Sequence, residues 1–229
     1  MRSGYGQFCP IAMAAEILCA RWTPLLIREF LCGSTRFNDL RRGLPRMSPS
    51  LLSKRLKELE TAGVIKSVQG AKGVREYNLT KAGEELRPLV MGMGIWGQRW
   101  VESGLSLDNL DPELLIWDMH RGLNIDPLPK KRLCLQFVFD DLPTAKQNYW
   151  LLADSETGVE ACYADPGHDV DLYAVSNLRT MTAIWMGVDT VQNAVDDSRL
   201  VLTGTREIAS LMQDWLGLSP FAQEGRMAG

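Results

Sequence analysis

The chain has 229 residues, of which 45% are hydrophobic and 23% charged, a composition typical of a soluble globular protein with one or two domains. Its five cysteines are odd in number and include no C-x-x-C pair, so the sequence suggests neither a disulfide framework nor a zinc site. It shows no secretory signal pattern and no run of about eighteen apolar residues. We therefore expect a cytoplasmic protein that does not span a membrane and holds no metal or other cofactor.

Charge is distributed unevenly along the chain. Residues 1–110 contain 16 Lys and Arg against 10 Asp and Glu, whereas residues 111–229 contain 9 against 18. A basic half suits a polyanionic partner, and an acidic half would be repelled by the same phosphates. Because turn formers between 103 and 112 separate the halves, we expect one domain at 1–104, a second at 113–222 and a frayed tail at 223–229.

Short helices are predicted before residue 45. Cys9–Pro10 and Thr23–Pro24 each place a proline at the first position of a helix, where a missing N–H costs nothing. Ser34 or Thr35 is expected to cap a further helix, which Gly43 ends.

The segment from Ser48 to Leu59 predicts a longer, well-capped amphipathic helix. Ser48 can accept from the free amides of the first turn, and Pro49 is suited to the first helical position. At 3.6 residues per turn one face carries leucines and the opposite face hydroxyls and lysines. The inward residues are Leu52, Leu56 and Leu59, and the outward ones are Ser50, Lys54, Lys57 and Thr61. A short helix, a tight turn and a longer basic helix form a helix-turn-helix.

A strand hairpin follows this helix. Residues 64–68 and 74–79 alternate like strands around a glycine-rich tip at 69–73, which predicts a wing. Alone, the basic helix could equally be a solvated face, but the cations of the neighbouring elements favour DNA binding. The candidate major-groove residues are Ser50, Ser53, Lys54 and Lys57; the candidate backbone contacts are Arg36, Arg46, Lys72 and Arg75, beside the cap Ser48.

Thr80 is expected to cap one more helix, with a four-three-four apolar seam of Leu89, Met93, Trp96 and Trp100. Glycines at 92, 94 and 97 weaken this helix by about 1 kcal/mol each relative to alanine. It therefore needs a packing partner, which is either the first helix or a second subunit.

The second half predicts an α+β domain. Strands at 133–139, 149–153, 159–163 and 170–174 are expected to form an antiparallel meander, followed by helices, a strand at 200–202 and a last helix. Its aromatic residues either line a ligand cavity or simply fill the core, which is the commoner outcome. They are Phe137, Phe139, Trp150, Tyr173, Trp185 and Trp215.

No catalytic motif is recognisable, so we do not expect an enzyme. Asp165, Asp169 and Asp171 surround His168 and could imitate a metal cluster, but a turn and a polar strand edge explain them as well. The remaining cysteines, Cys19, Cys32, Cys134 and Cys162, are interpreted as core residues.

The first half resembles the HxlR-type winged helix regulators. The resemblance is carried by an ordered set: Cys9–Pro10, Trp22, Arg36–Leu40, the Ser48–Glu60 helix, Gly63–Ile65 and Glu76–Gly83. It implies a homodimeric bacterial transcription regulator, more often a repressor, that binds a pseudo-palindromic operator and dimerises through its first and last helices. In that family an N-terminal cysteine often senses oxidants or electrophiles. Cys9 fits this role, because a helix N-terminus stabilises a thiolate, but it is equally a small residue packed at the dimer seam.

The second half, over about 113–222, more weakly resembles the sterol-carrier-like lipid-transfer fold, which implies a cavity for a small apolar effector. The alternative function is a hydrophobic-ligand carrier whose winged domain binds a protein partner. Such a protein would have no salt-dependent affinity for DNA.

Overall fold

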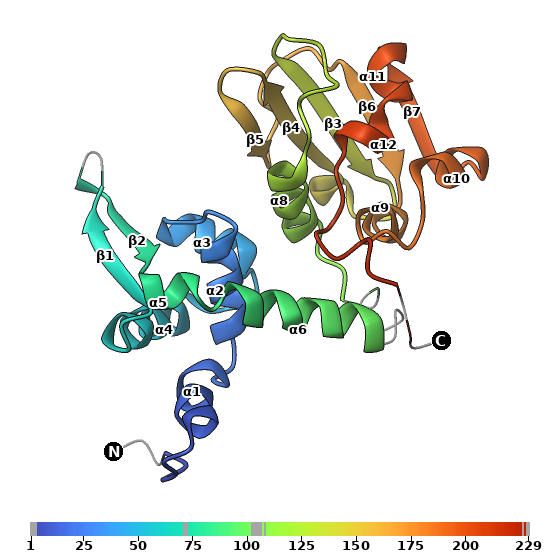
Figure 1. The fold of residues 1–229 in the computed structure, drawn as a ribbon. Coiled ribbons are helices and arrows are strands. Elements are labelled where there is room, and N and C mark those ends of the chain that lie inside the picture. Colours follow the sequence, from blue (N-terminus) through green and yellow to red (C-terminus); the bar gives the residue numbers. More distant parts are fainter. Residues whose placement is uncertain (1–3, 71–72, 102–106, 108, 226, 228–229) are drawn as a thin grey trace. The chain divides into compact units, whose positions relative to one another are not determined.

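The computed structural model describes all residues except 1–3, 71–72, 102–106, 108, 226 and 228–229 (Figure 1). The chain divides into two compact units, Met1–Gly94 and Ile95–Gly229, which are described separately. The expected boundary at 103–104 and the wing-tip residue Lys72 lie outside the described residues. The fold class predicted from the sequence is confirmed: a winged helix-turn-helix unit precedes an α+β unit.

The first unit contains helices and a two-stranded sheet. In chain order these are α1 (Pro10–Leu18), α2 (Thr23–Leu31), α3 (Phe37–Gly43), α4 (Pro49–Thr61), β1 (Ile65–Gln69), β2 (Arg75–Leu79), α5 (Lys81–Glu84) and the start of α6 (Arg87–Trp100). The core is formed by apolar side chains of α2, α3, α4 and β1, among them Leu26, Leu40, Leu56 and Ile65. The amphipathic pattern of α2–α4 therefore produces the helix-turn-helix.

The hairpin of β1 and β2 is antiparallel, with Ser67 opposite Tyr77. The segment before α3 joins it, since the Tyr77 amide donates to the Thr35 carbonyl at 2.8 Å and Arg36 bridges to Glu76. At the other end of β2, a Cβ on Gly83 would lie 2.2 Å from the Val64 carbonyl oxygen. Glycine is therefore required where α5 packs against the start of the wing.

Three local predictions in this unit were wrong. Thr23 is the first residue of α2 rather than its cap, because Trp22 takes the cap position with φ of 78°. Neither Ser34 nor Thr35 caps α3, which begins after Arg36. The helix expected from Thr80 is two helices: Thr80 caps only α5, and α6 begins at Arg87. A proline at 88 explains the break, since it lacks an N–H and its ring clashes with the carbonyl four residues earlier.

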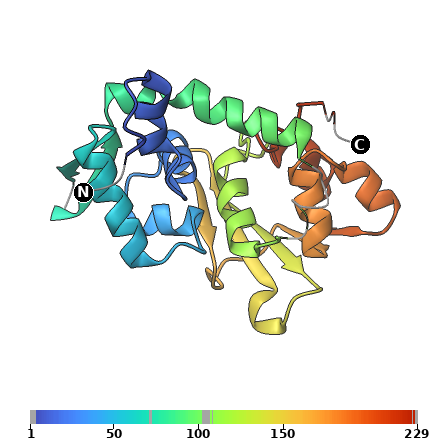
Figure 2. The same cartoon turned by 90° about the horizontal axis from the view of Figure 1, so that it is seen from below.

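The second unit contains a five-stranded sheet with helices. Its elements are α8 (Pro112–Gly122), β3 (Leu133–Phe139), the short 3-10 helix η2 (Thr144–Lys146), β4 (Asn148–Asp154), β5 (Gly158–Cys162), β6 (Leu172–Ser176), α9 (Leu178–Trp185), α10 (Val191–Asp196), β7 (Leu200–Gly204), α11 (Arg206–Ser210) and α12 (Met212–Trp215). Helix α8, capped by Asp111, was not predicted. Figures 1 and 2 show α8 and α9 side by side on one face of the sheet.

The strand order is β5-β4-β3-β6-β7. Strands β3, β4 and β5 form the expected antiparallel meander, but β6 does not continue it. It returns to the far side of β3 and pairs with it in parallel, with Phe137 opposite Ala174. The prediction of a simple meander was wrong because alternation identifies strands without specifying their neighbours.

The two faces of this sheet differ. The face toward the helices holds the main core, including Phe137, Leu151, Met119 and Trp215. The opposite, outer face carries only a small apolar cluster built on Cys134, Trp150 and Leu152. Near the end of the chain, Glu224 pairs with Arg99 of α6 at 2.6 Å.

Candidate nucleic-acid interface

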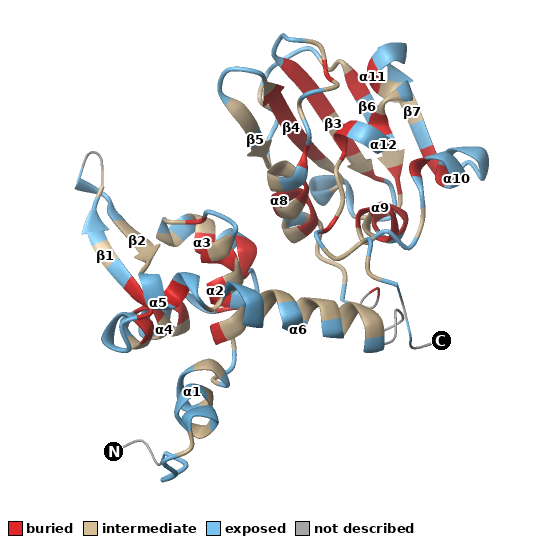
Figure 3. Ribbon diagram, viewed as in Figure 1, coloured by how far each residue is buried: buried red, intermediate tan, exposed pale blue. Residues whose placement is uncertain are grey.

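Helix α4 is positioned by its cap and its leucines. The Ser48 hydroxyl accepts from the Leu51 amide at 3.3 Å, and Pro49 occupies the first turn. Leu52, Leu56 and Leu59 are almost fully buried in the core of the unit. Figure 3 shows this buried stripe on α4. The opposite face of the helix is therefore held toward solvent in a fixed orientation.

That outer face carries hydroxyls and cations. Ser50, Ser53, Lys54 and Lys57 are exposed. The Ser53 hydroxyl donates to the Pro49 carbonyl at 3.0 Å, so its oxygen is left to accept. Neither Lys54 nor Lys57 forms an ion pair with another described residue. Two unpaired ammonium groups one turn apart suit phosphates or guanine edges.

The wing is fixed to α4 by Glu60. Its Oε1 accepts from the Ser67 amide at 3.1 Å and from the Ser67 hydroxyl at 2.5 Å. These hydrogen bonds, the hydroxyl first, hold the pKa of the Glu60 carboxyl below its usual value, assisted by the charge of Arg75. The end of α4 and the first wing strand therefore keep one relative orientation. Sequence reasoning missed this contact, because only the fold brings the two residues together.

The arginines predicted to contact the DNA backbone differ in whether they already interact with another side chain. Arg36 forms an ion pair with Glu76 at 3.0 Å, although its side chain remains half exposed. Arg75 is exposed, and its guanidinium lies over the Tyr77 ring at 6.0 Å. Arg46 is exposed in the turn before α4. The structure therefore brings cations of the turn, α4 and the wing into one unit. Among them, Arg36 already forms an ion pair with Glu76 of the wing.

A buried carboxylate braces the helix-turn-helix, and the sequence analysis missed it. Glu29 of α2 has a fully buried side chain and pairs with Arg28 at 2.7 Å, while Arg28 also donates to the Gly43 carbonyl at 3.1 Å. The Ser34 hydroxyl donates to Glu29 at 3.4 Å. A Cβ on Gly43 would lie 1.9 Å from the Glu29 carboxylate, so the end of α3 packs directly on this group. The brace fixes the turn that aims α4.

Helix α6 exposes the predicted seam. Leu89, Met93, Trp96 and Trp100 are 56%, 58%, 62% and 53% exposed, and no residue of α6 is buried (Figure 3). Helix α1 behaves in the same way: Ile11 is 79% exposed, and Ala14 is exposed too. Without a partner this apolar surface contacts water.

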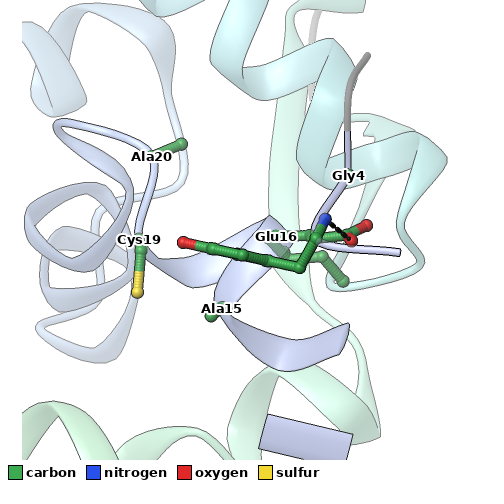
Figure 4. Close-up of a pocket in the computed structure, with 7 residues that line it drawn as sticks. Gly4, Ala15, Glu16, Cys19 and Ala20 are labelled. Carbon is green, nitrogen blue, oxygen red and sulfur yellow. Dashed lines mark hydrogen bonds between the residues drawn. The ribbon is translucent and has the colours of Figure 1, made fainter. Parts of the chain in front are cut away.

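The cysteines near the N-terminus lie around α1. Cys9 is partly exposed at the start of α1 and makes no side-chain capping bond. A hollow of about 410 Å³ lies beside α1. Figure 4 shows residues that line it, among them Glu16, whose carboxylate accepts from the Tyr5 amide at 2.8 Å. Cys19 lines this hollow and is exposed, as is Cys32, so their interpretation as core residues was wrong.

The six aromatic pocket candidates do not share one surface. Phe137, Phe139 and Trp215 are fully buried in the core beneath the helices, and Trp185 lies there too. The Trp215 Nε1 donates to the Ile208 carbonyl at 2.7 Å. Trp150 and Tyr173 belong to the outer face of the sheet. The six therefore do not line one cavity, because alternation along β4 and β6 turns these two away, and the other four lie in the core, the commoner of the two alternatives.

The capped basic helix, the hairpin beside it and the bracing of the turn define a winged helix-turn-helix DNA-binding protein. The HxlR-like helix-turn-helix family model matches residues 17–104. A Bacillus subtilis protein, the uncharacterized HTH-type transcriptional regulator YvaP, is 39% identical over 99 residues, 42% of this chain and 92% of YvaP. The chain belongs to the HxlR-like helix-turn-helix family.

Further relatives agree on the class. A Synechocystis HTH-type transcriptional regulator, sll1512, is 36% identical over 99 residues, 42% of this chain and 73% of that protein. The crystal structure of PA1607, a putative transcription factor, is 29% identical with a TM-score of 0.41 over 43% of this chain and 69% of that one. YvaP and sll1512 are both named as HTH-type transcriptional regulators, a class of DNA-binding protein and not of enzyme. The family model ends at residue 104, so most of the second unit lies beyond it.

No single helix among the described residues is both long and apolar enough to cross a bilayer. Helices α1 and α2 reach that length only together, across a bend of 81°.

Proposed function

We propose that the chain is a homodimeric transcriptional repressor that binds a pseudo-palindromic operator through α4 and the wing. The observation that carries the proposal is the outer face of α4, where Lys54 and Lys57 are exposed without ion-pair partners among the described residues. The repressor assignment follows from the resemblance to HxlR-type regulators. Two such helices in a dimer would read half-sites about 10 bp apart, or a multiple of that spacing.

Within this proposal the residues divide by role. Ser50, Ser53, Lys54 and Lys57 contact base edges or nearby phosphates from α4, while Arg46, Arg75 and Lys72 contact the backbone. Ser48 and Arg36 act mainly through the positions they hold, as the helix cap and as the partner of Glu76. The domains are those expected from the sequence, 1–104, 113–222 and a tail at 223–229.

The test begins with selection of bound genomic DNA by the purified chain, followed by fluorescence anisotropy on the selected duplex. Lys54→Ala is expected to weaken binding by about tenfold, and to lower the salt slope by about 1 if the ammonium contacts phosphate. If Lys54 reads a base, its removal relaxes the preference at one position. Lys146→Ala, an exposed lysine of η2, is the matched control. Unchanged affinity and unchanged preference in Lys54→Ala would contradict both roles.

Homodimerisation is supported by the exposed seam of α6 and the apolar residues of α1. Trp96→Asp is expected to convert the dimer to monomer in sedimentation velocity, because a carboxylate in an apolar interface lacks a partner. The matched control is Val201→Asp, which introduces the same charge at an exposed apolar position of β7. A wild-type chain that sediments as a monomer, or a Trp96→Asp dimer as stable as wild type, would contradict the assignment.

Two regulatory inputs complete the proposal. Cys9 is an oxidant or electrophile sensor if its modification releases DNA. Cys9→Ser protein that still loses DNA affinity under diamide would contradict this role.

The second unit has the sterol-carrier-like fold and takes a small apolar effector between sheet and helices. Thermal-shift screening with fatty acyl and sterol-like ligands that finds no stabiliser would count against it.

The alternative is a hydrophobic-ligand carrier whose winged unit binds a protein. It predicts an apolar stabiliser in the same screen and no salt-dependent affinity for any DNA.

A further inference from the structure

The outer face of the second unit's sheet carries a groove that the proposed function does not use. Its volume is about 450 Å³, within the range of small-molecule sites. Residues of β3, β4 and β6 line it, together with the connection that crosses from β5 to β6. This is the face opposite the helices, so the groove is separate from the core where an apolar effector would enter.

The floor of the groove is a row of three side chains. Gln136 on β3 lies directly opposite both Trp150 on β4 and Tyr173 on β6. The two aromatic residues are therefore two strand spacings apart, roughly 9.5 Å, with the glutamine between them. Trp150 is largely buried, Tyr173 is 40% exposed, and the Gln136 amide is fixed by donating to Asn148 Oδ1 at 2.8 Å. The row therefore presents two aromatic side chains to the groove, of which Tyr173 is the more accessible.

The rim of the groove is negative. Asp165 and Asp169 line it from the β5–β6 connection, and neither forms an ion pair with another described residue. Asp165 only accepts from the Gly167 amide at 2.8 Å. Lys131, which precedes β3, is paired with Asp171 at 2.8 Å. No lysine or arginine lies among the described residues that line the groove.

We propose that this groove binds an organic cation, with an ammonium or quaternary ammonium group held between Trp150 and Tyr173 and balanced by Asp165 and Asp169. Aromatic faces attract cations through their quadrupole, and quaternary ammonium groups are recognised in this way. His168 also lines the groove, but no described lysine or arginine does, so the two carboxylates disfavour anions and give a neutral ligand no electrostatic attraction. Among the described residues no group of three metal-ligating side chains is arranged to hold a metal ion.

The experiment measures binding directly on the full chain and does not depend on DNA. Isothermal titration uses choline and its uncharged, water-soluble isostere 3,3-dimethyl-1-butanol. The cation is expected to bind saturably in the millimolar range, about tenfold more tightly than the isostere. Binding by the isostere equal to that of the cation, or no saturable binding of the cation up to about 10 mM, would overturn the proposal.

Variants assign the binding to the groove. Tyr173→Ala and Asp169→Asn are each expected to weaken binding of the cation about fivefold or more, while Tyr173→Phe retains it. Both sites are exposed, so the fold should tolerate the changes. The matched control is Glu160→Gln, which removes a carboxylate from β5 outside the groove. If Glu160→Gln weakens binding as much as Asp169→Asn does, the cation is held by general charge and the assignment fails.

Discussion

Helices α4 and α6 are of nearly equal length, 13 and 14 residues, yet they expose opposite chemistry. Helix α4 buries its leucines within its own chain and exposes hydroxyl groups and lysines to solvent. Helix α6 has no fully buried residue, and it exposes two tryptophans, a leucine and a methionine to solvent. The first helix packs its apolar side within the unit and presents a surface for a polyanion, whereas the second leaves its apolar side in contact with water.

The sharpest test of this difference is one substitution made on both helices. Leu52→Ala in α4 is expected to lower the free energy of unfolding by about 2–5 kcal/mol, because it leaves a cavity in the core. Leu89→Ala in α6, at a position 56% exposed, is expected to change it by less than about 0.5 kcal/mol in dilute protein. Urea denaturation in dilute protein, at concentrations where the proposed dimer is dissociated, measures both changes in unfolding free energy. Equal losses would mean that α6 is covered within its own chain.

A pair of glycines extends the comparison. Gly43→Ala places a methyl group against the buried Glu29 carboxylate and is expected to cost about 1–3 kcal/mol in unfolding free energy. Gly92→Ala in α6 meets no atom within 4 Å and is expected to stabilise the helix by about 0.5–1 kcal/mol. Thermal unfolding of the two variants checks the signs. If Gly92→Ala instead weakens the dimer, a partner backbone approaches α6 closely at that point.

The smallest expected effect concerns the link between α4 and the wing. Hydrogen bonds from Ser67 lower the pKa of Glu60 in the folded chain below 4.5, so the carboxylate contributes stability above that pH and loses it as pH falls through the folded pKa. Glu60→Gln is expected to be less stable than wild type at neutral pH, with the gap closing in acid. Denaturant midpoints at pH 7 and near pH 3 test this. A gap that is constant with pH would show that ionisation of Glu60 plays no part.

Local signals predicted the parts of the fold that depend on neighbouring residues. The cap at Ser48, the leucine stripe of α4 and the wing strands were correct because each is specified within a few residues. The proline at 88 indicates the break before α6, but the prediction of one continuous helix from Thr80 did not take it into account. The left-handed backbone at Trp22 had no local signal, since a bulky residue there requires support from the surrounding structure.

The sequence by itself determined that a basic winged helix-turn-helix precedes an acidic α+β unit, because periodicity, caps and charge are read along the chain. The tertiary structure alone decided that β6 returns beside β3, that Glu29 meets Gly43, and that Trp150 and Tyr173 flank Gln136 across three strands. These contacts join residues far apart in sequence. Their existence depends on which strands and helices become neighbours, and alternation along one strand carries no information about its partner.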